Sequence, residues 1–303
     1  SRHKVGTAYV AVSRHKLNDF SGYLYKTEDF GKSWQILSSA FPAGEISRVI
    51  REDPKRPGLL YVGTESGVCV SLDDGDSWTK LETNLPVVPV YDLKVKDNDL
   101  VAGTHGRSFW ILDDLSLLRQ LTDEVLDGPA PLFNPDPAYR LLPILGVLTG
   151  DRLGDGKNYS IAQGVMATFE GSEAPSDGAS RTFLDAGENP PDGVVVTYHL
   201  HEPSDAGAIL SVQDGQGRVV RRFDVDGDAG MNRFVWDMRH EGARGAPGED
   251  LEKLIAGPSL EGPLVTPGTY QVKLDIGGES QSQRFEVLAD PRSEVTAEEL
   301  AQQ

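Results

Sequence analysis

Residues 71–78 (SLDDGDSW) repeat the pattern of residues 27–34 (TEDFGKSW) after an interval of 44 residues. Both segments follow Ser/Thr-x-Asp-x-Gly-x-Ser-Trp, a turn pattern that we call the box. Self-similarity at an interval of this size is typical of a β-propeller, in which each repeat forms one four-stranded blade. The two boxes therefore predict that the first part of the chain is built from propeller blades.

The clearest repeat covers residues 46–82. Its apolar segments predict strands over 46–52, 59–64, 67–72 and 77–81, with a turn rich in proline and glycine at 53–58. A third copy follows after 40 residues, since Gly63-Thr64 returns as Gly103-Thr104 and residues 72–74 return as 112–114. In that copy the box decays, with leucines in place of its glycine and tryptophan. We therefore expect about two and a half to three four-stranded blades.

The box residues have a local structural explanation. The aspartate can accept N–H bonds across its turn, the glycine allows an unusual backbone angle, and the tryptophan can pack between neighbouring blades. These residues are Asp29, Gly31 and Trp34 in the first copy and Asp73, Gly75 and Trp78 in the second. A catalytic residue occurs once in a protein, whereas a turn residue occurs once in every blade. The repetition therefore favours a structural role over a pair of catalytic acids.

The segments LYVGT (60–64) and VSLDDGDSW (70–78) resemble those of the Asp-box, or BNR-repeat, β-propellers, especially the sortilin-type and xyloglucanase-like groups. The resemblance covers residues 5–120 and implies the C-terminal portion of such a propeller. This family includes glycoside hydrolases, sialidases, sorting receptors and assembly factors. The resemblance therefore implies a fold and leaves the function open.

The remaining sequence predicts an all-β chain with a second domain. Short strands, a candidate core residue at Trp236, and a PGTY turn at 267–270 favour an immunoglobulin-like or fibronectin-like sandwich. We expect a partial propeller over 1–126 and a Pro/Gly-rich connector with short strands and a flexible loop over 127–186. The sandwich is expected over 187–290, and the TAEE segment at 296–299 predicts the start of a helix over 291–303.

Composition narrows the classes of partner. The net charge of −18 argues against nucleic acid, because phosphate binding requires clustered lysine and arginine. The sequence contains no apolar run of the roughly 18 residues that a membrane span needs. The single cysteine, Cys69, lies in an apolar strand pattern and is expected in the core. The chain opens in strand-like sequence without an initiator methionine, so we expect a fragment or processed product of an extracellular or periplasmic protein.

The loops between the second and third strands of the blades are the best candidate for a binding face. They carry Glu65 in one blade and His105 with Arg107 in the next, and Asn84 belongs to a connection on the same side. An imidazole, a guanidinium group and nearby aromatic rings can hold a carboxylate or a sugar ring. The alternative for Arg107 is an ion pair with Asp113 that closes the seam of the propeller.

Other motifs carry weaker signals. The run DVDGDAG (224–230) resembles a calcium loop, but its glycine is misplaced and Val235 stands where a bidentate glutamate is needed, which favours a hairpin turn. His199 and His201 share one face of a strand, but no third metal ligand is evident. We expect neither a metal nor a cofactor.

Two functions remain open at the level of sequence, besides a purely structural role in a larger envelope protein. The first is binding of a protein or carbohydrate ligand on the propeller face by a fragment of an exported Asp-box protein. The alternative is a glycoside hydrolase whose catalytic carboxylates lie in missing upstream blades, because such an enzyme needs two carboxylates across a cleft. Whether the full protein is an enzyme is left open.

Overall fold

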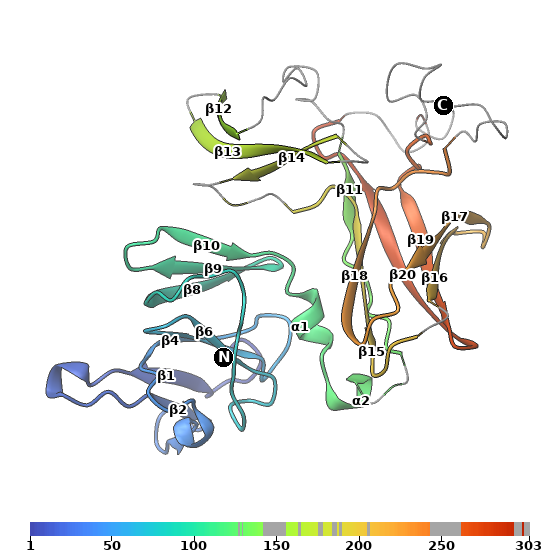
Figure 1. Ribbon diagram of the computed structural model, residues 1–303. Helices are drawn as coiled ribbons and strands as arrows, with labels where there is room; N and C mark the ends of the chain where they lie inside the picture. Colours follow the sequence, from blue (N-terminus) through green and yellow to red (C-terminus); the bar gives the residue numbers. More distant parts are fainter. Residues whose placement is uncertain are drawn as a thin grey trace. The chain divides into compact units, whose positions relative to one another are not determined.

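The computed structural model describes residues 1–126, 128, 130–141, 156–162, 165–174, 178–183, 187, 190–204, 207–242, 262–293 and 299 (Figure 1). The chain divides into two compact units. Unit 1 contains residues 1–134, 197–203 and 228–231, and unit 2 contains residues 135–196, 204–227 and 232–303. Among the described residues, no helix has the length and apolar character to cross a membrane.

Unit 1 contains three antiparallel sheets, which confirm the predicted partial propeller (Figure 1). The first blade is β1 (Ala8–Val12), β2 (Tyr23–Thr27) and β3 (Gln35–Ile36). The second, complete blade is β4 (Ser47–Glu52), β5 (Leu60–Thr64), β6 (Val68–Ser71) and β7 (Thr79–Lys80). The third is β8 (Val90–Lys96), β9 (Asp99–Thr104) and β10 (Phe109–Leu112). Short 3-10 turns occupy His15–Leu17 and Ser38–Ala40, and helices α1 (Ser116–Gln120) and α2 (Asp123–Leu126) follow β10.

The second blade is apolar on both faces because it lies between the other two. Toward the first blade it presents Ile50, Leu60, Val62 and Cys69, which pack with Leu24 and Leu37. Toward the third blade it presents Val49, Leu59, Tyr61, Val68 and Val70, which pack with Leu93, Leu100 and Ala102. A strand covered on both faces reads as a continuous apolar run, which explains the LYVGT sequence of β5. Burial raises the pKa of the Cys69 thiol to about 11, as expected for a core residue.

Glycine is required at one point of close approach between the second and third blades. A Cβ atom on Gly63 would lie 2.7 Å from both the Val90 carbonyl oxygen and the Val49 Cγ1 atom. A larger residue in this position would force β8 away from β5. The Gly-Thr pair at the end of β5 therefore has a packing reason as well as a place in the repeat.

A buried ion pair fastens helix α1 to the second blade. The Arg119 Nε atom donates to both carboxylate oxygens of Asp53 at 3.0 Å, and the Asp53 side chain is fully buried. Asp53 also accepts the Lys55 and Arg56 backbone N–H groups and the Tyr61 hydroxyl. Burial raises the pKa of Asp53, but the Arg119 and backbone hydrogen bonds outweigh burial and hold it below its usual value.

Unit 2 contains a β-sandwich core. Its five-stranded sheet has the order β11 (Ala138–Arg140), β20 (Glu279–Ala289), β19 (Gly268–Ile276), β16 (Ala208–Asp214) and β17 (Val219–Val225). The second sheet pairs β15 (Val194–Leu200) with β18 (Gly230–Trp236), of which residues 194–196 and 232–236 belong to unit 2. The fully buried Trp236 ring packs on Tyr270 and Phe285, with centroids at 5.7 and 6.1 Å, so it joins the two sheets. The expected all-β architecture with a sandwich is confirmed.

The region predicted as a connector contains more strand than expected. A separate antiparallel sheet is formed by β12 (Gly156–Ala162), β13 (Val165–Ala174) and β14 (Gly178–Phe183). Residues 170–174, part of the stretch expected as a flexible loop, belong to β13. All five pair with β14, and Glu170 and Gly171 also pair with β12. Of the region 291–303 predicted to begin a helix, the structure describes residues 291–293, which are not helical, and Glu299; the rest lies outside the described residues.

Replacing Arg119 with alanine is expected to destabilise unit 1 by about 3–5 kcal/mol, because it leaves the Asp53 carboxylate buried without a counter-ion. The measurement is urea unfolding followed by tryptophan fluorescence. The double variant Asp53→Asn with Arg119→Met should recover part of the loss, because the uncompensated charge is gone. Equal stability of Arg119→Ala and wild type would show that the pair does not hold the helix.

Candidate functional site

The two boxes form the same hydrogen-bonded turn. The Asp29 carboxylate accepts the Ser33 backbone N–H at 2.9 Å and the Ser33 hydroxyl at 2.6 Å. In the second blade, Asp73 accepts the same two groups of Ser77 at 2.9 and 2.5 Å. The first residue of each box, a threonine or serine, accepts the N–H of the box glycine with its hydroxyl oxygen. Gly31 and Gly75 have φ angles of 83° and 95°, in the region that favours glycine.

The box carboxylates are held in their ionised form. Hydrogen bonds from the Ser33 hydroxyl and N–H lower the pKa of Asp29 to about 2. Partial burial raises the pKa of Asp73, but its hydrogen bonds with Ser77 outweigh burial and lower it overall. A general acid needs the opposite shift, toward neutral pH. Each box aspartate is therefore suited to stabilising its turn and poorly suited to donating a proton.

The two box tryptophans have different surroundings. Trp78 is 8% exposed, and its Nε1 atom donates to the Leu37 carbonyl of the first blade at 3.1 Å. The Phe41 ring meets its edge at a centroid distance of 5.6 Å. Trp34 is 46% exposed, which differs from the expected position between blades. The first blade covers Trp78, but among the described residues of unit 1 no further blade covers Trp34 in the same way.

The predicted binding loops meet through two residues that the sequence did not single out. Glu65 forms an ion pair with Arg48, whose guanidinium carbon lies 4.9 Å from the centre of the Tyr91 ring. The Tyr91 ring in turn lies 5.0 Å from the His105 ring, at an interplanar angle of 38°. We call Glu65, Arg48, Tyr91 and His105 the stacked cluster. It runs across the second and third blades.

Equivalent bulges explain the position of Arg48 and Tyr91. The register between β4 and β5 shifts between Ser47 and Val49, and the register between β8 and β9 shifts between Val90 and Asp92. The extra residue is Arg48 in one strand and Tyr91 in the other. A bulge turns its extra side chain out of the regular alternation of the strand. Strand periodicity alone gives no signal for such a shift, so both residues escaped the sequence prediction.

The other two predicted ligand residues lie outside the stacked cluster. Asn84 and Arg107 are both exposed, and among the described residues no hydrogen bond, ion pair or ring contact joins either of them to Glu65 or His105. The Arg107 carbonyl accepts the Trp110 Nε1–H at 2.9 Å, which closes the β9–β10 loop. The ion pair of Arg107 with Asp113, the alternative from the sequence, stays a prediction. Arg107 is exposed, so it is accessible to a ligand.

Exposed apolar side chains surround this end of the third blade. Val87, Tyr91, Phe109 and Ile111 are 83%, 48%, 76% and 57% exposed. Phe109 and Ile111 alternate along β10 with Trp110 and Leu112, which pack toward the core, so they occupy the outer face of the blade. Apolar groups of this size beside a cation and an imidazole are typical of interaction surfaces.

The other candidates have structural explanations. The His199 and His201 rings meet at 5.0 Å, and the described residues contain no group of three side chains suited to holding a metal ion. The 224–230 segment joins β17 to β18, which belong to different sheets. The segment is therefore a crossover between sheets and not the predicted hairpin. The sheet that each strand joins is set by its pairing partner, which is β16 for β17 and β15 for β18.

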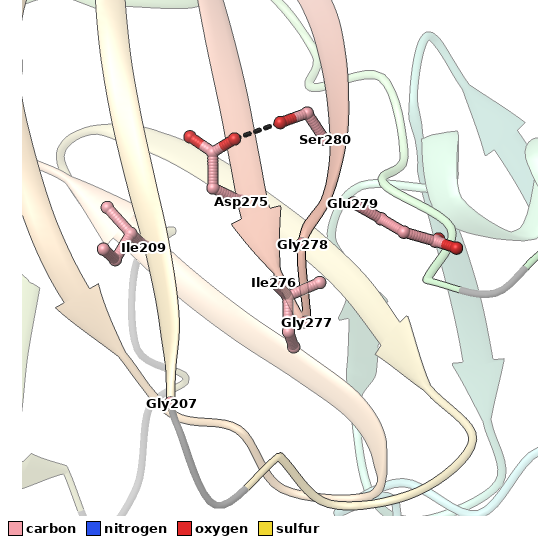
Figure 2. A pocket seen from close by; sticks show the side chains of 8 residues that line it. All are labelled: Gly207, Ile209, Asp275, Ile276, Gly277, Gly278, Glu279 and Ser280. Carbon is pink, nitrogen blue, oxygen red and sulfur yellow. Dashed lines mark hydrogen bonds between the residues drawn. The ribbon is translucent and has the colours of Figure 1, made fainter.

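A shallow hollow lies at the β19–β20 turn of unit 2 (Figure 2), lined by Gly207, Ile209, and residues 275–280. Its Asp275 carboxylate accepts the Ser280 hydroxyl and pairs with Lys273 at 2.7 Å. Figure 2 shows Asp275 and Glu279 extending to opposite sides of the turn. The two carboxylates therefore do not form the facing pair that glycoside hydrolysis requires.

No protein-family model matches the chain, and no curated protein matches its sequence. Among solved structures, the chain is similar to PorZ, described as an essential bacterial surface component of the type-IX secretion system of Porphyromonas gingivalis. The identity is 17%, over 93% of this chain and 37% of that one, with a TM-score of 0.27. A structure described as YCF48 bound to D1 peptide gives 17% identity over 71% and 62%, with a TM-score of 0.25.

A biofilm-associated protein BSP domain gives 11% identity over 95% of this chain and 67% of that one, with a TM-score of 0.17. The chain spans 37% and 62% of the lengths of the first two structures. At these TM-scores the similarities carry no argument about function. Function has to be argued from the residues of this chain.

Replacing Asp73 with asparagine is expected to destabilise the chain at pH 7 by about 1–2 kcal/mol, because the ionised carboxylate holds two Ser77 donors. Since the folded pKa of Asp73 is lowered, its contribution is full above the unfolded pKa of about 3.9 and disappears as the pH falls through the folded value. The difference from wild type should therefore shrink below about pH 4.

Urea unfolding at a series of pH values measures this difference. Asp76→Asn, an exposed change in the same turn, is the matched control and should leave stability within about 0.5 kcal/mol of wild type. A loss for Asp73→Asn that is the same at pH 3 and pH 7 would contradict the role of its charge.

Proposed function

We propose that these residues belong to an exported Asp-box β-propeller protein that binds a protein or glycan partner through the loop face of its second and third blades. The stacked cluster is the observation that supports this proposal. An exposed Tyr91 ring lies between a paired Arg48 and the exposed His105, in reach of solvent. Aromatic rings held in this way provide contact area at a small cost in conformational entropy.

The ion pair of the stacked cluster keeps the ring in position. Arg48 and Glu65 are the less exposed members, with side chains 17% and 32% exposed. Because Glu65 neutralises Arg48, the guanidinium group presents a flat surface to Tyr91 without an unpaired charge. The free charge of this face comes instead from Arg107, on the same loop as His105. The arrangement suits a partner with an apolar or sugar surface next to a carboxylate.

The net charge of the chain sharpens this expectation. At −18, the chain repels an anionic partner at long range. A carboxylate would therefore be accepted only close to the cationic loop residues, with apolar contact supplying most of the affinity. This favours a defined local epitope over a large acidic partner.

The alternative is a glycoside hydrolase. The box aspartates are committed to their own turns and have lowered pKa values, so they do not provide the acid of such an enzyme. A hydrolase would draw its catalytic carboxylates from elsewhere in the full-length protein. A polysaccharide turnover screen on the full-length protein distinguishes the two functions, because only the hydrolase gives turnover. In that case, Asp29→Ala and Asp73→Ala would change stability without abolishing the chemical step.

Replacing Tyr91 with alanine is expected to weaken partner binding at least about tenfold, because an aromatic anchor at a binding surface typically contributes more than about 1.4 kcal/mol. Binding to a glycan array is one measurement. Photo-cross-linking from a benzophenone side chain at position 91, in cells that produce the protein, is the other.

Leu17→Ala is the matched control, since Leu17 is 70% exposed but lies in the first blade. Binding should be unchanged in this variant, and cross-linking from position 17 should not give the same adduct. Identical array profiles and identical adducts from positions 91 and 17 would show that the loop face is not the binding site.

A further inference from the structure

The first blade has an unpaired strand where the second blade has a paired one. Equivalent hydrogen bonds align β1 with β5. In the first blade, Phe30 N–H donates to the Gly6 carbonyl (3.0 Å) and the Ser1 terminal ammonium donates to the Thr7 carbonyl (2.9 Å). The equivalent donors in the second blade are Asp74 N–H, to the Gly58 carbonyl (2.8 Å), and Asp53 N–H, to the Leu59 carbonyl (2.8 Å). In the second blade β5 pairs with β4 on one side and β6 on the other. In the first blade, among the described residues, β1 pairs only with β2 (Figure 1).

Equivalent side chains of the two blades also differ in burial. In the second blade, Ile50 of β4 lies opposite Val62 of β5, and Val62 is fully buried in the cluster with Leu24 and Leu37 of the first blade. Val10 occupies the position of Val62 in the first blade, and it is 37% exposed. The row across the first sheet from Val10 continues through Tyr25 to Ile36, which is 58% exposed. An apolar row that is covered in one blade is open in the other.

The edge of β1 also lacks the features that protect an open strand. Its sequence, AYVAV, contains no proline and no charged residue. Exposed edges of soluble proteins usually carry such residues, because unpaired N–H and C=O groups invite another strand. An edge without them is typical of a strand that has a partner.

We propose that the edge of β1 takes one antiparallel strand of the same propeller from outside residues 1–303, with a branched aliphatic side chain opposite Val10. The proposal rests on the proposed function in so far as these residues are part of a larger propeller. The interface between β4 and β5 serves as the template. It places Val49 and Ile50 on successive positions, one for each face of the sheet.

The geometry favours a single strand over a second copy of the chain. In the second blade, which serves as the template, β4 is an edge strand of the sheet, and it contacts both β1 and β8 of the neighbouring blades. One strand therefore fills the space at this position. A second β1 would bring β2 and β3 behind it, since the three strands are hydrogen-bonded into one sheet.

The test uses the complete chain and an acetylated, amidated peptide with the sequence of residues 46–53 (ISRVIRED), labelled for fluorescence anisotropy. We expect saturable binding with a Kd on the order of 10⁻⁴ M, as for short peptides that add to a sheet edge. Val10→Lys should weaken binding at least about tenfold, because it places a charge in the apolar row. Ile111→Lys changes an exposed aliphatic residue on the edge strand of the third blade and should leave the Kd within about twofold.

Two N-methylated peptides separate backbone pairing from side-chain contact. One carries methyl groups on the N–H groups of alternate residues, and the other carries them on the remaining residues. In an antiparallel pair only alternate N–H groups face the partner strand. One methylated peptide should therefore lose binding, and the other should bind like the parent.

Several outcomes would overturn the proposal. The first is the absence of binding at up to 1 mM peptide, a concentration on the order of tenfold above the expected Kd. The others are equal losses of binding in Val10→Lys and Ile111→Lys, and equal binding of the two methylated peptides. A dimer of the wild-type chain in sedimentation that Val10→Lys converts to a monomer would assign the edge to a second copy instead. Tyr91→Ala should leave peptide binding unchanged, so a failure of the loop-face function and a failure of strand addition are distinguishable.

Discussion

The hydrogen bonds of the box aspartate set the geometry on which unit 1 depends. Asp73 holds the Ser77 N–H and hydroxyl, and this fixes the turn that delivers Trp78 into the seam between the first two blades. Trp78 then donates to Leu37 of the neighbouring blade. A local turn thereby determines a contact between residues 41 positions apart in sequence. The first blade has the same turn, and its Trp34 is 46% exposed.

The scaffold and the candidate binding face arise from different features of the same strands. Regular pairing of β4 with β5 and of β8 with β9 provides the rigid sheets. The bulges at the start of β4 and β8 release one side chain from each sheet, and these two side chains form the centre of the stacked cluster. Because the bulges lie at equivalent positions, the repeat brings Arg48 and Tyr91 together without any sequence similarity between them. Substitution at a bulge can therefore change a binding surface while the blade is retained.

The parts of the structure that follow from local sequence were predictable. The box turn, the strands of the second blade and the place of Trp236 in a sandwich all depend on patterns within a few residues. The partners of Glu65 and His105 were not predictable, because a bulge shifts the register by one residue and leaves no periodic signal. The sequence of the crossover at 224–230 predicts a hairpin for a related reason. A turn sequence shows that the chain reverses but does not show which sheet receives the next strand.

The outer faces of the first and third blades differ in chemistry, and this difference separates the two inferred interactions. The outer row of the third blade contains Lys94, Val101 and Ile111, so a charge lies at the inner end of an apolar row. The outer row of the first blade contains Val10, Tyr25 and Ile36, with no charge. The interface between the first and second blades uses the row Ile50, Val62 and Cys69, which is apolar over three strands and ends at Lys80 on β7. The proposed strand addition therefore fits the first blade, whose row is apolar on all three strands, and the proposed partner binding fits the third blade, which has a charge on its inner strand and the stacked cluster.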